Sequence, residues 1–218
     1  MLSNLNEAPI PTHNLSGLLP IFVSSFGLGM AFGGYIPLLA LWLESIGVSF
    51  ALIGLIAGAG SIGVIISAYI GPRVVKYVGY LKAAIFGIFL ASLAGVLFRL
   101  CNNEFLWLTL RIIAGLGFGL HWVISEAWLG HLVTDKNRTR AMSFYVISMA
   151  LGFTIGPIII WFTGVSTIAP FIIISVIQAF SVLPLILLWQ VQPAQSNEAP
   201  LSPFFLLKAG PKIAAGCI

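Results

Sequence analysis

Six long apolar stretches alternate with short polar segments along this chain, at residues 18–43, 50–70, 83–100, 106–128, 141–162 and 169–189. Each stretch is nearly free of charge and about twenty residues long, which is the length that an α-helix needs to cross the hydrocarbon core of a bilayer. Lipid offers no hydrogen-bond partners to backbone amides, and the apolar runs do not alternate as the strands of a barrel do, so helices are expected. The pattern predicts an all-α, polytopic membrane protein with six transmembrane helices in the lipid bilayer.

The composition excludes several other classes of protein. Of the 218 residues, 59% are hydrophobic and only 7% are charged, which leaves too little polar surface to cover a soluble globule. The formal net charge is +4, but the basic residues are scattered over short loops, so nucleic acid is not expected as a partner. Cys101 and Cys217 are far apart and form no CxxC pattern, so neither a disulfide framework nor a zinc site is expected.

Lysine and arginine predict the orientation in the membrane. Eight basic residues lie in alternate connections or after the last span: Arg73, Lys76, Lys82, Lys136, Arg138, Arg140, Lys208 and Lys212. The opposite side has Arg99 near a span end, with Glu44 and Glu104 as acids. Because short cytoplasmic loops are enriched in basic residues, we expect both termini in the cytoplasm and the chain in a cell membrane, the bacterial inner membrane.

The composition also divides the chain into segments. We expect a cytoplasmic N-terminal segment at residues 1–17, a six-helix bundle at 18–189 and a cytoplasmic linker at 190–210, because residues 190–203 are rich in Pro, Gln, Ser and Asn. Residues 211–218 begin a new apolar segment. They are too few to cross a bilayer, so they are expected to be the start of a truncated seventh helix.

The fourth span concentrates ionisable residues, which are Arg111, His121 and Glu126. Each costs about 2.5–3.5 kcal/mol at the centre of a membrane helix, so each needs a partner or a wet cavity and is a candidate for a substrate cavity or proton coupling. At 100° per residue, one broad stripe of this helix holds Arg111, Gly115, Phe118, Trp122 and Glu126. This stripe is expected to face a cavity, whereas His121 points to one side.

Each of these residues also has a purely structural interpretation. Glu126 would form an ion pair with the basic segment between the second and third spans, and His121 would be hydrogen-bonded between helices. We favour both over substrate contact. For Arg111 we expect helix carbonyls or polar side chains of the first span to hold the guanidinium. A metal site made of His121, Glu126 and His131 is not expected, because steps of five residues rotate the ligands apart by about 140°.

Four local motifs occur in a fixed order along the chain. Residues 71–82 read Gly-Pro-Arg-Val-Val-Lys-Tyr-Val-Gly-Tyr-Leu-Lys, and the fourth span opens with Arg111-x-x-x-Gly115-x-Gly117. The fifth span contains Gly152-x-x-x-Gly156-Pro157, and Ser125-Glu126-Ala-Trp128-Leu129 is followed by Asn137-Arg-Thr-Arg140. Together with six spans and two cytoplasmic termini, these motifs resemble the N-terminal six-helix half of a major facilitator superfamily transporter, of the YcaD-like branch. The chain departs from the family pattern at Lys76, where an acid is usual.

The resemblance implies a twelve-helix fold of two halves, with a small-molecule substrate between them and alternating access by rocking. A C-terminal six-helix half would then be the partner of this chain. A cytoplasmic gate would comprise Gly71, Arg73, Lys76, Gly79 and Lys82 with Glu126, and Gly152, Gly156 and Pro157 would form a helix-packing motif. Glycines spaced three to four residues apart in the spans suit close helix packing, and they also suit faces that slide during a transport cycle.

The sequence therefore indicates the N-terminal half of a secondary-active transporter that moves a small solute, by facilitation or with proton coupling. The alternative is a membrane scaffold or assembly protein that does not transport. An enzyme is not expected, because no Ser/His/Asp set, HExxH motif or pair of membrane aspartates occurs, and no cofactor is implied. The solute could be anionic or zwitterionic and meet Arg111, or it could be hydrophobic.

Overall fold

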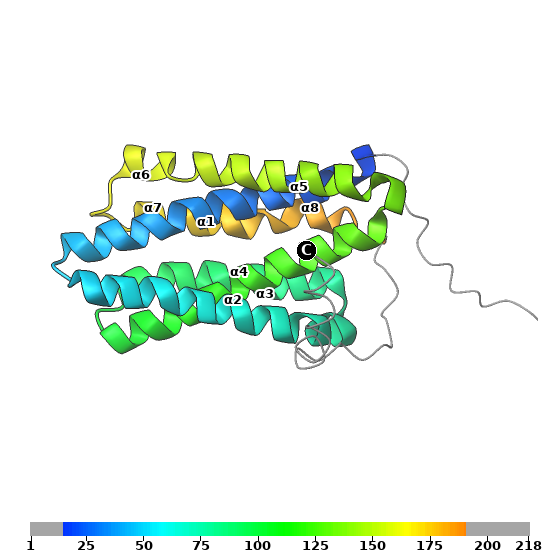
Figure 1. Ribbon diagram of the computed structural model, residues 1–218. Coiled ribbons are helices and arrows are strands. Elements are labelled where there is room, and N and C mark those ends of the chain that lie inside the picture. The colour runs from blue at the N-terminus through cyan, green and yellow to red at the C-terminus, as the bar shows by residue number, and fades with distance from the viewer. Residues whose placement is uncertain (1–14, 191–218) are drawn as a thin grey trace, which may run out of the picture.

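The computed structural model describes residues 15–190, which are almost entirely helical (Figure 1). A short 3₁₀ helix η1 (Leu15–Leu18) is followed by α1 (Leu19–Ser45), α2 (Phe50–Val78), α3 (Tyr80–Leu100), α4 (Glu104–Leu132), α5 (Asp135–Ile155), α6 (Ile158–Thr163), α7 (Ala169–Phe180) and α8 (Val182–Ile186). Residues 15–190 contain no strand. Most of the predicted N-terminal segment, the linker and the start of a seventh helix lie outside the described residues.

Within residues 15–190, six helical segments are long and apolar enough to cross a membrane: Leu19–Ser45, Phe50–Val78, Tyr80–Leu100, Glu104–Leu132, Asp135–Thr163 and Ala169–Ile186. The fifth comprises α5 and α6, and the sixth comprises α7 and α8. The predicted all-α, multi-pass architecture is thereby confirmed.

The segment at residues 71–82 is not the loop that the sequence predicts. Helix α2 continues to Val78, well past the expected end at residue 70, so Arg73 and Lys76 lie on its last two turns. Gly79 alone joins α2 to α3, with a φ of +84° that residues with side chains rarely adopt. Hydropathy locates the lipid-immersed part of a helix, and it does not detect polar turns that project beyond the hydrocarbon.

Both of the last two spans contain a break. In the fifth span α5 ends at Ile155, and α6 begins after Gly156 and Pro157. Proline disfavours a continuous helix because it has no N–H and its ring clashes with the preceding turn. In the sixth span the break lies at Ser181, whose hydroxyl donates to the Gln178 carbonyl at 2.6 Å.

The helices form two layers (Figure 1). One layer contains α1 with α5, α6, α7 and α8, and the other contains α4 with α2 and α3. Within the layers, α1 packs against α5 and α7, and α4 packs extensively against α2 and α3. Between the layers, α3 packs against α7. Contacts between α1 and α4 are fewer, so the layers leave room along α4.

Glycines bring α1 and α5 into backbone contact: Gly29, Gly33, Gly152 and Gly156. A Cβ atom at Gly33 would collide with the Phe153 carbonyl, and one at Gly152 would collide with the Phe26 carbonyl. Helices in lipid associate through such close approach, because van der Waals contact has to replace the hydrophobic effect. Gly152 and Gly156 thus lie in the contact with α1, where the predicted packing motif would act, and sliding of these faces stays a prediction.

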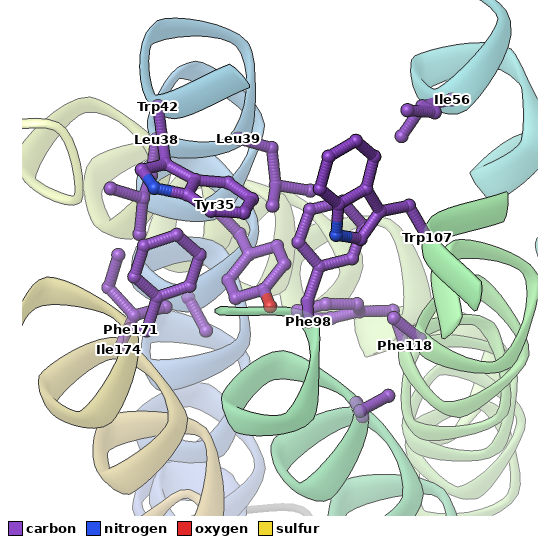
Figure 2. Close-up of a cluster of buried hydrophobic side chains, with 14 of the residues drawn as sticks. Tyr35, Leu38, Leu39, Trp42, Ile56, Phe98, Trp107, Phe118, Phe171 and Ile174 are labelled. Carbon is purple, nitrogen blue, oxygen red and sulfur yellow. The ribbon is translucent and has the colours of Figure 1, made fainter. Parts of the chain in front are cut away.

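An aromatic cluster closes one end of the bundle (Figure 2). The Trp42 ring meets Phe98, Trp107 and Phe171 edge to face, with centroids 5.9, 5.7 and 5.6 Å away. The indole N–H of Trp107 donates to the Cys101 carbonyl at 2.8 Å. Since these rings come from α1, α3, α4 and α7, they hold both layers together at this end.

Candidate solute cavity

Three hollows follow one another along α4. The first is lined by Arg111, the second by Phe118 and Trp122, and the third by Glu126. At a rise of 1.5 Å per residue, Arg111 and Glu126 are roughly 22 Å apart along the helix. Of the predicted stripe, Arg111, Phe118, Trp122 and Glu126 thus line three separate hollows, whereas Gly115 packs against the backbone of Gly60 in α2. We name these the Arg111 hollow, the central cavity and the Glu126 hollow.

The central cavity has a volume of about 360 Å³ and lies between α1, α2, α4 and α5. This size falls in the range of about 300–1,000 Å³ that is typical of sites for small molecules. Its wall is aromatic and aliphatic, and Phe32, Trp122, Met149 and Phe153 contribute large parts of it. No charged side chain from the described residues lines it. The Thr154 hydroxyl is already engaged, because it donates to the Ala150 carbonyl at 2.9 Å.

Phe32 of α1 is the aromatic centre of this wall. Its ring lies 5.6 Å from Phe118, 6.5 Å from Trp122 and 6.0 Å from Phe153, between centroids. Rings at these distances attract one another beyond their burial of area, and their faces also suit a planar apolar ligand. The wall is therefore shared by α1 and α5 of one layer and α4 of the other.

Arg111 lies beside the central cavity and not in it. Its side chain is 6% exposed and lines the Arg111 hollow of about 70 Å³ between α1, α2 and α4. The expectation that carbonyls or polar side chains of the first span hold it is not met at Nε, which is buried and has no hydrogen-bond partner within residues 15–190. The face of the guanidinium lies against Gly60, where a Cβ would be 2.8 Å from Cζ.

Glu126 is exposed in the Glu126 hollow of about 470 Å³, which His131 and Arg138 also line. Its predicted ion pair with Arg73, Lys76 or Lys82 is not formed. Among the described residues, the only ion pair joins Arg138 to Asp135 at 3.8 Å.

Arg73 of α2 has partners within its own helix. The guanidinium of Arg73 turns back along its own helix, where it donates to the Tyr69 carbonyl at 2.9 Å and lies 4.2 Å from the centroid of the Tyr69 ring. Gly71 faces Val123 of α4 at ordinary contact distance. The candidate gate segment therefore lies beside the Glu126 end of α4 without an ionic latch.

His121 is fully buried and lines none of the three hollows. The Gln178 amide nitrogen donates to its Nδ1 at 3.2 Å, and its Nε2 is 2.9 Å from the Ser24 hydroxyl. The interpretation of His121 as a histidine hydrogen-bonded between helices is confirmed, since it joins α4 to α1 and α7.

Sequence reasoning missed most of the cavity wall. Phe32, Met149 and Phe153 are ordinary apolar residues in apolar spans, and nothing in the sequence distinguishes them from residues that face lipid. Ser24 and Gln178 did carry a signal, because polar side chains inside a span need partners.

Comparison with known proteins agrees with this architecture. The family model described as Major Facilitator Superfamily matches residues 21–215. An uncharacterized MFS-type transporter, YfkF of Bacillus subtilis (strain 168), is 27% identical over 181 residues, which are 82% of this chain and 45% of that protein. Multidrug resistance protein 2 of the same organism is 26% identical over 137 residues, covering 63% of this chain and 33% of that protein.

Two further similarities concern the branch and the fold. The uncharacterized MFS-type transporter YcaD of Escherichia coli O17:K52:H18 (strain UMN026 / ExPEC) is 27% identical over 125 residues, covering 56% of this chain and 32% of that protein. The crystal structure of the peptide transporter POT in complex with sulfate superposes with a TM-score of 0.72 at 19% identity, over 96% of this chain and 46% of that one. At this identity the second likeness concerns the fold alone. The chain spans about half the length of the first of these relatives.

Proposed function

Because the chain belongs to the major facilitator superfamily, a family of transporters and not of enzymes, we propose that it is half of a secondary-active transporter that moves a small solute by alternating access. The observation that carries this proposal is the central cavity of about 360 Å³. The cavity is walled by α1, α2, α4 and α5 of this bundle, and a second bundle that rocks against this one would expose it to the two sides of the membrane in turn. Such movement around a midplane site is how transporters built from repeated bundles work.

The cavity wall favours a hydrophobic solute. A charged ligand in this cavity would lose its hydration and gain no partner from the apolar side chains around it. Arg111 and Glu126 lie in other hollows, so the alternative of an anionic solute that meets Arg111 has less support. We propose a neutral compound with a ring, which would stack on Phe32 and Trp122.

A second six-helix bundle would complete the transporter. The relative YfkF is about twice as long as the part that this chain covers, and the family fold pairs two such bundles. Helix α2 offers an open face to a partner, since nothing lies within 4 Å of a Cβ built at Gly54 or Gly58. Small residues on an open face of this kind allow another helix to approach closely.

We further propose that both termini lie in the cytoplasm of a bacterial cell, on the side of Lys136, Arg138 and Arg140, as the positive-inside rule requires. In intact cells, a cysteine at position 135 should then be protected from a membrane-impermeant maleimide, and one at position 104 should be labelled. Asp135 and Glu104 are both exposed. Cys101 and Cys217 would first be replaced by serine. Labelling of Asp135→Cys together with protection of Glu104→Cys would reverse the orientation.

A binding experiment tests the solute site. The chain in nanodiscs should bind the neutral aromatic probe N-phenyl-1-naphthylamine saturably, measured by energy transfer from tryptophan, with empty nanodiscs as the control for partition into lipid. We expect Trp122→Ala to weaken binding at least about tenfold, because a ring contact worth about 1.4 kcal/mol or more is lost. The matched control is Trp161→Ala, since Trp161 is 79% exposed and lines none of the hollows described above. Equal affinities of the two variants would contradict the site.

A further inference from the structure

The positive charge of Arg111 has no counter-charge. A guanidinium cannot lose its proton in a protein, so burial leaves it charged. Its side chain is 6% exposed, Nε has no partner, and no carboxylate of residues 15–190 lies within 4.0 Å of it. Tyr35 is close to Arg111, but its hydroxyl donates to the Gly95 carbonyl at 2.6 Å. The tyrosine is therefore neutral and does not balance the charge of the guanidinium. A buried and unpaired cation is costly, and an anion would remove that cost.

The surroundings of Arg111 favour an anion and exclude other polar ligands. Every other side chain that lines the Arg111 hollow is apolar, among them Leu39, Leu43 and Ile56. An anion there would meet no competing acceptor, and low polarity strengthens its attraction to the guanidinium. Gly60 leaves the space in which the guanidinium lies flat, since a Cβ there would be 2.8 Å from Cζ and 2.9 Å from Nε.

The volume of the hollow decides the size of the anion. At about 70 Å³ it is far smaller than the central cavity of about 360 Å³, and the two share no lining residue. One water needs about 10–15 Å³ of such space, so the hollow has room for a halide with a few waters. A drug-sized solute needs about 300 Å³ or more.

We propose that Arg111 binds a small monovalent inorganic anion of the size of chloride, in a site between α1, α2 and α4 that is separate from the central cavity. The anion neutralises the buried guanidinium without a carboxylate of the protein. The site is independent of transport, because it follows from an unpaired charge, a small apolar hollow and the glycine that admits the guanidinium.

Chloride binding can be measured directly. The purified chain in nanodiscs of zwitterionic lipid, in sodium gluconate, would be titrated with sodium chloride at constant ionic strength while the ³⁵Cl NMR linewidth is recorded. We expect saturable broadening beyond that of empty nanodiscs, and we expect Arg111→Gln to abolish it. The matched control is Arg99→Gln, which removes the same charge from the end of α3, where Arg99 donates to the Ser166 carbonyl at 3.4 Å; it should retain the broadening.

A second variant keeps the test decisive if Arg111→Gln loses helicity by circular dichroism. Ala40→Leu adds a branched side chain to the wall of the hollow and leaves the charge in place, so it should also abolish the broadening. Wild-type protein without saturable broadening would overturn the proposal, as would undiminished broadening in Ala40→Leu. Benzoate that displaces both chloride and N-phenyl-1-naphthylamine would overturn the separation from the central cavity, since Arg111 would then belong to the solute site.

Discussion

Replacing Gly115 with alanine is expected to separate α4 from α2 and to destabilise the bundle. A Cβ at this position would collide with the backbone carbonyl of Gly60 and would lie 3.1 Å from the Gly60 Cα. Gly60 has no flexible side chain that could move away. Overpacking of this kind costs about 1–3 kcal/mol or more. Alanine favours a helix over glycine by about 1 kcal/mol, so the collision should exceed the gain in helix propensity.

The matched control is Gly58→Ala in α2, where nothing lies within 4 Å of the added Cβ. This variant makes the same chemical change without a collision, so it should keep or raise stability by up to about 1 kcal/mol. Unfolding by sodium dodecyl sulfate in mixed micelles, followed by circular dichroism, compares the midpoints. Equal midpoints of the two variants would show that the α2–α4 contact is not as tight as the backbone positions indicate.

The sequence was sufficient to predict the membrane architecture and the stripe of α4. Six apolar runs of membrane length leave helices as the only structure that satisfies their backbone. The helical period then places Arg111, Trp122 and Glu126 on one face and His121 on another. The structure follows both expectations, because neither depends on the contacts that a side chain makes.

Pairing between side chains could not be predicted from the sequence. Glu126 and the basic residues of α2 lie at the same end of the bundle, yet Arg73 binds Tyr69 of its own helix instead. That choice depends on the direction in which Arg73 leaves α2, and the direction follows from a helix that continues through residues 71–78. Proximity along the membrane normal is therefore a weak guide to ion pairs.

The sequence also could not predict that Arg111 and Glu126 lie outside the central cavity. A stripe on one helix gives the direction of its side chains, whereas α1, α2 and α5 decide where the space along that stripe is filled. Gly60 admits the guanidinium of Arg111, and Phe32 turns its ring onto Phe118. As a result, the structure has three hollows with different linings along α4, where the sequence predicts one cavity.

The final prediction is that proteoliposomes containing this chain alone show no saturable uptake of neutral aromatic solutes. Alternating access needs two bundles that rock about a shared site, and the part of the chain that the structure describes provides the six spans of one bundle. The bundle itself should still insert and fold, because its backbone bonds are satisfied within helices and its glycines allow close packing. Binding of N-phenyl-1-naphthylamine to the same proteoliposomes, lost in Trp122→Ala, is the control for a folded cavity. Robust saturable uptake by monomers of the chain would contradict the two-bundle mechanism, since the six helices would then form a complete pathway across the bilayer.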